Sequence, residues 1–207
     1  AWNYPMQIAC WKSAPALAAG NAFILKPSEE TPLVAHKVAE LLQAAGLPDG
    51  LFQIIHGDRD IGAALCAHPG IAKISLTGGV ETGRLIMAQS AQSLKKITLE
   101  LGGKSPLLVF EDCDFDLAVQ TALDANFYTG GEVCSNATRV FVQRSIADDF
   151  IAAMTARTEA MRVGDPMASD IQMGALISGR HLAKVLDYVK IGVDEGATIA
   201  TGGNALQ

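Results

Sequence analysis

Short apolar runs alternate with helix-forming segments along the first hundred residues, and this alternation limits the folds open to the chain. The runs lie at 22–25, 52–55, 71–76 and 96–101, with helical patterns at 6–19, 31–45, 61–67 and 81–90. Apolar strands separated by helices are typical of β-α-β units, in which helices cover a parallel sheet. We therefore predict an α/β fold that begins with a parallel, Rossmann-like sheet. Thr31 is expected to cap the second helix, with Pro32 at its first position and Gly46 after its end.

The pair Gly102-Gly103 marks the expected boundary between two domains, 1–102 and 103–207. A second α/β pattern follows it, with strands expected at 106–110, 139–142 and 198–200 and helices at 115–127, 147–162 and 180–194. Both ends of the chain are abrupt, so we expect part of a longer protein.

The composition narrows the classes of function. The 207 residues are 49% hydrophobic, enough for a sizeable core. The net charge is −6 and no basic run occurs, so neither nucleic acid nor an anionic membrane is an expected partner. No apolar run reaches the ~18 residues that span a bilayer, and no signal peptide is recognisable.

The four cysteines are widely spaced and form no C-x-x-C pair. This predicts a reduced, cytoplasmic protein with no metal site. We expect three of them to be packing residues, namely Cys10, Cys66 and Cys113.

Two turns at strand ends are candidates for binding a nucleotide. The run Thr77–Gly83 lies at a strand-to-helix turn, where backbone N–H groups suit a phosphate. Its glycines are not spaced as G-x-G-x-x-G, so a tight structural turn is an equal alternative. The run Lys26-Pro27-Ser28-Glu29 follows another strand end, where parallel sheets tend to bind ligands. Lys26 and Glu29 could reach ribose hydroxyls, and a solvated loop is the alternative.

Cys134 and Glu100 are the candidates for chemistry. Cys134 follows Gly130-Gly131 and precedes small polar residues, unlike a packing cysteine. Glu100 is a single acid between apolar residues on a strand pattern, which favours either an exposed edge position or a functional carboxylate. No histidine is placed as a partner for the thiol, which argues against a Cys–His protease. The pair fits a covalent nucleophile and a base that activates water.

At these residues the chain resembles the NAD(P)-dependent aldehyde dehydrogenases. Glu100-Leu-Gly-Gly-Lys-Ser-Pro and Gly131-x-x-Cys134 look like the two signatures of that family. Three further motifs match in order, and the resemblance covers essentially the whole chain: Trp2-Asn3-Tyr4-Pro5, Lys26-Pro27-Ser28-Glu29 and the turn from Thr77 to Gly83. The run around Cys134 is most similar to the betaine-aldehyde and trimethylaminobutyraldehyde branch. The fold implied is an incomplete aldehyde dehydrogenase, with an NAD-binding part followed by part of a catalytic domain.

The resemblance implies a role for each catalytic candidate. Cys134 would attack the aldehyde carbon, while the Asn3 amide and the Cys134 N–H would hold the developing oxyanion. Glu100 would then activate water to release the acid from the thioester. Lys12 matches a lysine assigned to a proton relay, and a solvated helical lysine is an equal alternative.

The resemblance also implies a cofactor, NAD, with NADP as a possible substitute. It would lie over Trp2, Lys26, Ser28, Glu29, Gly57, Gly79, Val80, Glu81 and Thr82, with Gly102 giving access to the nicotinamide. A carboxylate at Glu29 should repel a 2′-phosphate and so favour NAD.

For the substrate, the resemblance assigns Tyr4 and Trp11 to an aromatic box around a trimethylammonium group. If a helix begins near Pro5, the two rings face nearly the same way and could hold a cation between them. Packing of a helix face is the alternative. The implied reaction is NAD-dependent oxidation of betaine aldehyde, or a similar trimethylammonio aldehyde, by a homo-oligomer.

The sequence departs from the family pattern at two positions, and two alternative functions remain open. Glu132 stands where the family usually has Gln, and a carboxylate near the thiol would raise the Cys134 pKa. Ala137 replaces a frequent Gly. One alternative is a CoA-acylating semialdehyde dehydrogenase, which does not need the base Glu100. The other is a fragment that cannot catalyse, because the segments expected to hold the nicotinamide ribose and to form the oligomer are absent.

Overall fold

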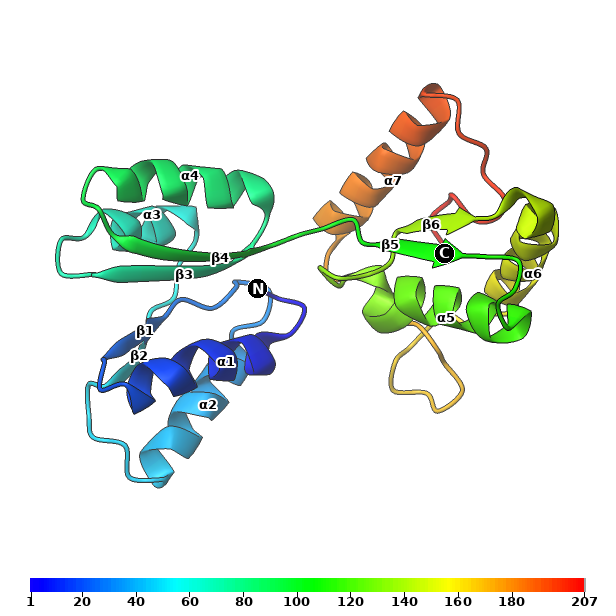
Figure 1. Ribbon diagram of the computed structural model, residues 1–207. Helices are drawn as coiled ribbons and strands as arrows, with labels where there is room; N and C mark the ends of the chain where they lie inside the picture. The colour runs from blue at the N-terminus through cyan, green and yellow to red at the C-terminus, as the bar shows by residue number, and fades with distance from the viewer. Residues whose placement is uncertain (207) are drawn as a thin grey trace. The chain divides into compact units, whose positions relative to one another are not determined.

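The computed structural model describes residues 1–206 and divides into two compact units, Ala1–Gly102 and Gly103–Gln207. Strands alternate with helices in each unit (Figure 1). All three strand pairs in the described residues are parallel, as expected for an α/β chain.

The first unit contains two separate pairs of parallel strands. β1 pairs with β2, and β3 pairs with β4. Its elements are α1 (Pro5–Ala18), β1 (Phe23–Leu25), α2 (Leu33–Ala44), β2 (Phe52–Ile54), α3 (Arg59–Ala67), β3 (Lys73–Gly78), α4 (Val80–Ala91) and β4 (Lys96–Leu101). The parallel direction is confirmed, but no hydrogen-bonded ladder within residues 1–102 joins the two pairs into one sheet. β1 and β2 are only three residues long and offer few backbone groups to a further neighbour.

The β3–β4 register decides which side chains share a face. Ser75 lies opposite Thr98, and Thr77 lies opposite Glu100. Because side chains alternate along a strand, these four belong to one face of the pair. α4 packs closely on β4: a Cβ added at Gly83 would come within 2.9 Å of the Leu101 Cδ1 atom.

The expected cap at Thr31 is wrong. α2 begins at Leu33 with Pro32 as its N-cap, and the buried Thr31 hydroxyl has no hydrogen-bond partner. The Thr31 N–H donates to the Ser28 carbonyl, and the Pro32 carbonyl accepts from the Ala35 N–H. The chain therefore turns before the helix, and the Thr31 side chain does not cap it.

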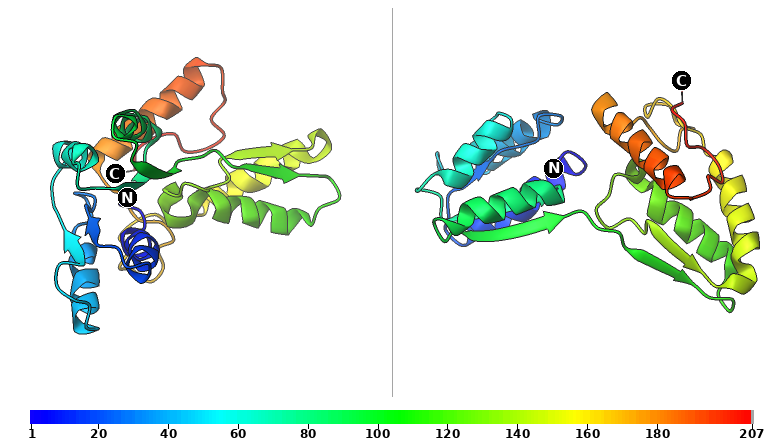
Figure 2. Two further views of the ribbon diagram at one scale, coloured as in Figure 1. Left: turned by 60° about the vertical axis from the view of Figure 1, so that its left-hand side comes forward. Right: turned by 90° about the horizontal axis from the view of Figure 1, so that it is seen from above.

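The second unit is built around the parallel pair β5 and β6. Its elements are β5 (Pro106–Val109), α5 (Phe115–Phe127), the 3-10 turn η1 (Tyr128–Gly131), β6 (Arg139–Val142), the 3-10 turn η2 (Arg144–Ile146), α6 (Ala147–Glu159) and α7 (Gly179–Asp194). Figure 2 shows α5 running along the strand pair. Its core consists of Val109, Val119, Ala122, Leu123 and Phe150.

The strand expected at 198–200 is absent. These residues are irregular, and Ile199 is partly exposed. A strand needs a neighbour to take its backbone hydrogen bonds, and no strand of the described residues does so here.

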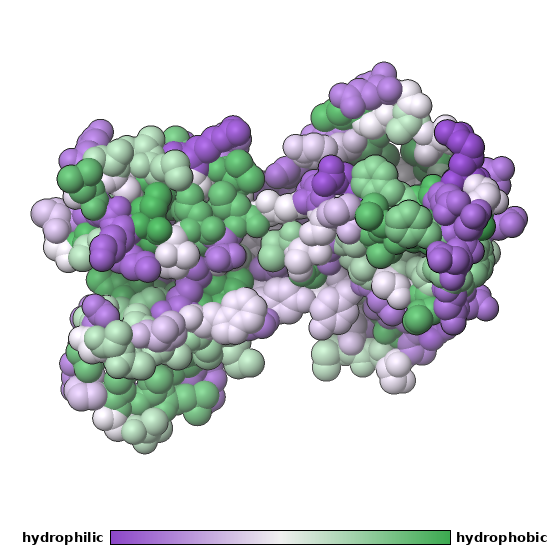
Figure 3. All heavy atoms as spheres, in the orientation of Figure 1, coloured by the Kyte–Doolittle hydropathy of each residue, from purple (hydrophilic) through white to green (hydrophobic). Residues whose placement is uncertain are grey.

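Large hydrophobic side chains reach the surface of both units, as the green areas of Figure 3 show. They include Leu85 and Met87 on α4, Leu108 and Phe141 on the strand pair β5–β6, and Tyr188 on α7. No helix within residues 1–206 is long and apolar enough to cross a membrane.

Candidate active site

Cys134 lies on a loop that begins with an unusual turn. Thr129, Gly130 and Gly131 have φ values of 53°, 63° and 76°. This left-handed backbone is easy for glycine but costs energy at a β-branched threonine. A Cβ at Gly131 would also come within 3.1 Å of the Asn126 carbonyl oxygen. The glycine is therefore required by the turn that carries the chain to Cys134.

Backbone contacts hold the Cys134 loop on its other side. The Gly103 N–H donates to the Cys134 carbonyl at 3.2 Å. Asn136, only 6% exposed, donates from its side chain to the Asn126 carbonyl at 3.3 Å. The thiol itself is exposed on this anchored loop. Sequence reasoning missed Asn136, although a polar residue within a run of small residues was a possible signal.

Glu132 is tied to the start of α7. Its Oε1 accepts the Ile177 N–H at 3.2 Å and lies 3.5 Å from His181 Nε2. The side chain is only 12% exposed. His181 lies half-buried in the first turn of α7. No local pattern could have found this pair, because its members are distant in sequence.

Glu100 and Lys12 are electrostatic neighbours within the first unit. Glu100 is exposed near the end of β4, and Lys12 donates from Nζ to the Ser75 hydroxyl at 2.7 Å. Burial lowers the pKa of Lys12, while the Glu100 carboxylate opposes that shift and Lys73 adds to it. Ser75 was also missed by sequence reasoning.

The residues before α1 are half-buried. Tyr4 is the N-cap of α1, and the Asn3 Oδ1 accepts its N–H at 3.1 Å. Trp2 lies beside them, while Trp11, on α1, is 69% exposed. Tyr4 has φ −134° and ψ 62°, so it lies outside the helix. Trp11 lies within the helix, and the expectation that the two rings face the same way stays a prediction.

Lys26 links the ends of two strands. Its ammonium donates to the Gly57 carbonyl at 2.6 Å and to Glu29 Oε1 at 2.9 Å. Gly57 has φ 146°, and a Cβ there would lie 2.2 Å from Ile61 Cγ1, so the position requires glycine. Ser28 stays within the same turn, where its hydroxyl accepts the Glu30 N–H at 3.3 Å. The family resemblance had placed these residues in one cofactor site; their contact here follows from the adjacent carboxyl ends of paired parallel strands, and their role in binding stays a prediction.

The turn that opens α4 leaves space around its glycine. Gly79 is the N-cap, and no side chain caps the helix. Val80, Glu81 and Thr82 form the first turn, where N–H groups point out of the helix end. Glu81 pairs with Arg84 at 2.8 Å. A Cβ added at Gly79, or at Gly102 after β4, would meet no atom within 4 Å.

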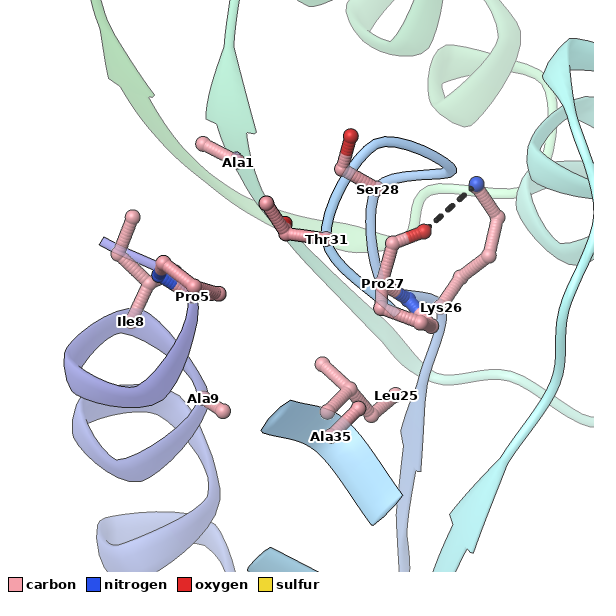
Figure 4. Close-up of a pocket in the computed structure, with 10 residues that line it drawn as sticks. All are labelled: Ala1, Pro5, Ile8, Ala9, Leu25, Lys26, Pro27, Ser28, Thr31 and Ala35. Carbon is pink, nitrogen blue, oxygen red and sulfur yellow. Dashed lines mark hydrogen bonds between the residues drawn. The ribbon is translucent and has the colours of Figure 1, made fainter. Parts of the chain in front are cut away.

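A small cavity lies between α1, the end of β1 and the start of α2 (Figure 4). Its volume is about 30 Å³, and Lys26, Ser28 and Thr31 line it together with apolar residues. This is room for about one water molecule and not for a dinucleotide. Two of the cofactor candidates, Lys26 and Ser28, thus line a cavity that is too small for the cofactor itself.

The other cysteines differ in environment. Cys66 is buried, and burial raises the pKa of its thiol. Cys113 packs against the core of the second unit. Cys10 is exposed, so its expected packing role is wrong: the face of α1 that carries it is not covered by other described residues. No group of three potential metal ligands occurs within residues 1–206.

Comparison with known proteins identifies the class. The model of the aldehyde dehydrogenase family matches residues 1–207, and the chain belongs to this family. Betaine aldehyde dehydrogenase of Rhizobium etli is 58% identical over 203 residues, which are 98% of this chain and 42% of that protein. The chain thus spans less than half the length of such relatives.

Two solved structures bear on the cofactor. Betaine aldehyde dehydrogenase of Staphylococcus aureus in complex with NAD⁺ is 42% identical with a TM-score of 0.97, and 99% of this chain covers 41% of it. An Escherichia coli NADP-dependent enzyme is 37% identical with a TM-score of 0.95, and the whole chain covers 43% of it. The predicted α/β fold and the family resemblance are confirmed.

Proposed function

We propose that the protein containing this chain oxidises an aldehyde to a carboxylic acid with NAD, through a thioester on Cys134. The observation that carries the proposal is the exposed Cys134 thiol on a loop held at Gly103, Asn136 and Glu132. Family membership and the similarity to betaine aldehyde dehydrogenases support it. Residues 1–102 would bind the cofactor and residues 103–207 would supply the nucleophile.

Three observations support the proposal that the first unit binds the dinucleotide. The uncapped end of α4 offers N–H groups to a pyrophosphate, and Gly79 leaves open space for it. Gly102 leaves similar space after β4. The Glu81 charge at this helix end is balanced by Arg84. Lys26, Ser28 and Glu29 would hold the adenosine ribose, with Trp2 and Gly57 nearby.

We propose NAD as the preferred cofactor, with Glu29 repelling a 2′-phosphate. The bond from Lys26 holds Glu29 Oε1 in place and offsets part of its charge. The expected preference is therefore moderate. Glu29→Gln should raise kcat/KM with NADP relative to NAD, and an unchanged ratio would contradict this role.

Cys134 would act first. Its thiolate would add to the carbonyl carbon, and the Asn3 amide and the Cys134 N–H would stabilise the oxyanion of the thiohemiacetal. Nicotinamide, when bound, would supply the acceptor for the hydride that leaves this carbon, and the carbon would remain on sulfur as a thioester.

Glu100 would act second. Its carboxylate would take a proton from water as the water oxygen attacks the thioester carbon. The C–S bond then breaks, the acid leaves, and Cys134 is restored as the thiolate that began the cycle, while the proton from water stays on Glu100. Lys12, an electrostatic neighbour of Glu100, would pass the proton onward.

The expected substrate is betaine aldehyde or a similar trimethylammonio aldehyde. Trp11 presents a large exposed ring, and an aromatic face attracts a quaternary ammonium group. Tyr4 would supply a second ring from the N-cap of α1. The test compares betaine aldehyde with a neutral aldehyde of similar length; equal kcat/KM values would contradict the aromatic box. We further propose that the whole protein is a cytoplasmic homo-oligomer.

The nucleophile is tested in the whole protein by Cys134→Ala. We expect aldehyde oxidation to fall by roughly 10⁴-fold or more, the scale of removing a covalent nucleophile. Cys10→Ala is the matched control, because Cys10 is also an exposed thiol. Oxidation that survives Cys134→Ala would overturn the covalent mechanism.

A further inference from the structure

Glu132 places a carboxylate two residues before the proposed nucleophile, yet the structure turns that carboxylate toward α7. We propose that Glu132 and His181 form a positioning pair, which anchors the Cys134 loop to the start of α7 and compensates a charge that would otherwise disfavour the thiolate. The inference rests on the proposed function only in naming Cys134 as the nucleophile.

The contacts come from two different parts of the second unit. Glu132 Oε1 accepts the Ile177 N–H at 3.2 Å, and His181 Nε2 lies 3.5 Å from the same oxygen. The first distance is a hydrogen bond, while the second is an ion-pair distance. Ser178 caps α7 by accepting the His181 N–H at 3.3 Å, which fixes the turn that presents the imidazole.

Charge explains why the pair is needed. A carboxylate that is only 12% exposed loses much of its hydration, so it requires donors or a positive partner. The Ile177 N–H supplies a donor next to the N-terminus of a 16-residue helix, where the helix dipole favours negative charge. His181, when protonated, supplies the opposite charge. Together they would offset the Glu132 charge, which stands two residues before Cys134 in the chain.

The backbone explains why an anchor at this position matters. Glu132 directly follows the three left-handed residues Thr129, Gly130 and Gly131. Strained backbone persists only where surrounding contacts hold it. The Glu132 carboxylate holds the end of the turn, and the Gly103 N–H holds the Cys134 carbonyl. Loss of the first contact removes the hold on the end of the turn and leaves the loop held by the Gly103 and Asn136 contacts.

A double-mutant cycle in the whole protein tests the pair. His181→Phe keeps a ring but removes the nitrogen that faces Glu132, while Glu132→Gln keeps an oxygen that can accept the Ile177 N–H. The measured quantity is the rate of alkylation of Cys134 by iodoacetamide at neutral pH, followed by peptide mass spectrometry. The exposed Cys10 provides a reference rate in the same molecule.

We expect His181→Phe to slow alkylation of Cys134 by roughly fivefold or more, a coupling typical of residues in contact. Glu132→Gln should stay within about twofold of wild type, and adding it to His181→Phe should restore the rate, because the carboxylate charge that His181 faces is then gone. His181→Lys, which keeps a cation in reach, should also retain the rate. A slow double variant, a slow His181→Lys variant or no effect of His181→Phe would overturn the proposal.

One control variant and one property of the assay separate the role of the pair from other causes of slow alkylation. Glu159→Gln alters a comparable contact in the second unit, the 3.0 Å hydrogen bond from the Thr201 hydroxyl, and should leave Cys134 alkylation unchanged. Alkylation needs neither aldehyde nor dinucleotide. A wild-type protein without dehydrogenase activity would therefore refute the proposed function, while the alkylation cycle would still decide the role of the pair.

Discussion

Two glycine-containing turns, one in each unit, use glycine for opposite reasons. In the turn before Cys134, Gly131 has φ 76° and a Cβ there would press on the Asn126 carbonyl. In the turn that opens α4, Gly79 has φ −73°, and a Cβ would meet nothing within 4 Å. Gly131 is required by the backbone conformation of its turn, whereas no contact within the first unit requires a glycine at position 79.

This difference distinguishes a turn that positions a side chain from a turn that leaves room for a ligand. The turn at Gly131 is held by neighbouring backbone and by Glu132, as a loop carrying a nucleophile should be. The turn at Gly79 is open at an uncapped helix end, as a surface that admits a phosphate should be. Small residues in similar sequence settings thus indicate different functions once their surroundings are known.

The largest expected effect comes from Gly131→Ala. The substitution forces a Cβ into left-handed backbone and against a carbonyl oxygen, so we expect a loss of about 1–3 kcal/mol in unfolding free energy. Urea unfolding of the whole protein measures it, and Cys134 alkylation should slow in parallel. If Gly131→Ala unfolds with the same free energy as wild type, the turn accommodates the Cβ without cost, and the contrast with Gly79 does not hold.

The sequence anticipates contacts that follow from strand order but not contacts between a loop and a distant helix. β4, α5 and β6 have the predicted bounds because their apolar patterns are regular and their ends carry clear turn residues. Lys26 meets Gly57 because paired parallel strands end side by side. The Glu132–His181 pair has no such rule, since α7 is placed by tertiary packing. The expected strand at 198–200 fails for a related reason, because an apolar triplet does not specify its own partner.

Gly79→Ala should have the opposite profile to Gly131→Ala. Its Cβ enters space that the proposed pyrophosphate would approach, so we expect KM for NAD to rise by roughly tenfold through steric conflict. The unfolding free energy should change by less than about 1 kcal/mol, the scale of a helix-cap exchange. Steady-state kinetics and urea unfolding of the same sample measure both. A large loss of stability with unchanged KM would assign this glycine to folding and would break the comparison.

Lys12 offers the test with the smallest expected effect. In contrast to Gly79, this residue of the first unit makes a specific contact within its own unit. Its ammonium donates to Ser75, and burial lowers its pKa below the ordinary lysine value. Between the folded and unfolded pKa values the unfolded chain binds more protons, so this residue makes stability rise with pH in that alkaline window. Lys12→Met should reduce this rise of the unfolding free energy with pH, by less than about 1 kcal/mol because the ammonium is only partly buried.

Ser75→Ala removes a hydrogen bond to the charged form of Lys12 and should make the rise of the unfolding free energy steeper. Urea unfolding at a series of pH values up to about 10.4, the unperturbed lysine pKa, measures both slopes. If unfolding free energy rises with pH equally in wild type and Lys12→Met, the lysine is solvated in the folded protein. Lys12 would then not be a side chain that its own unit holds in place.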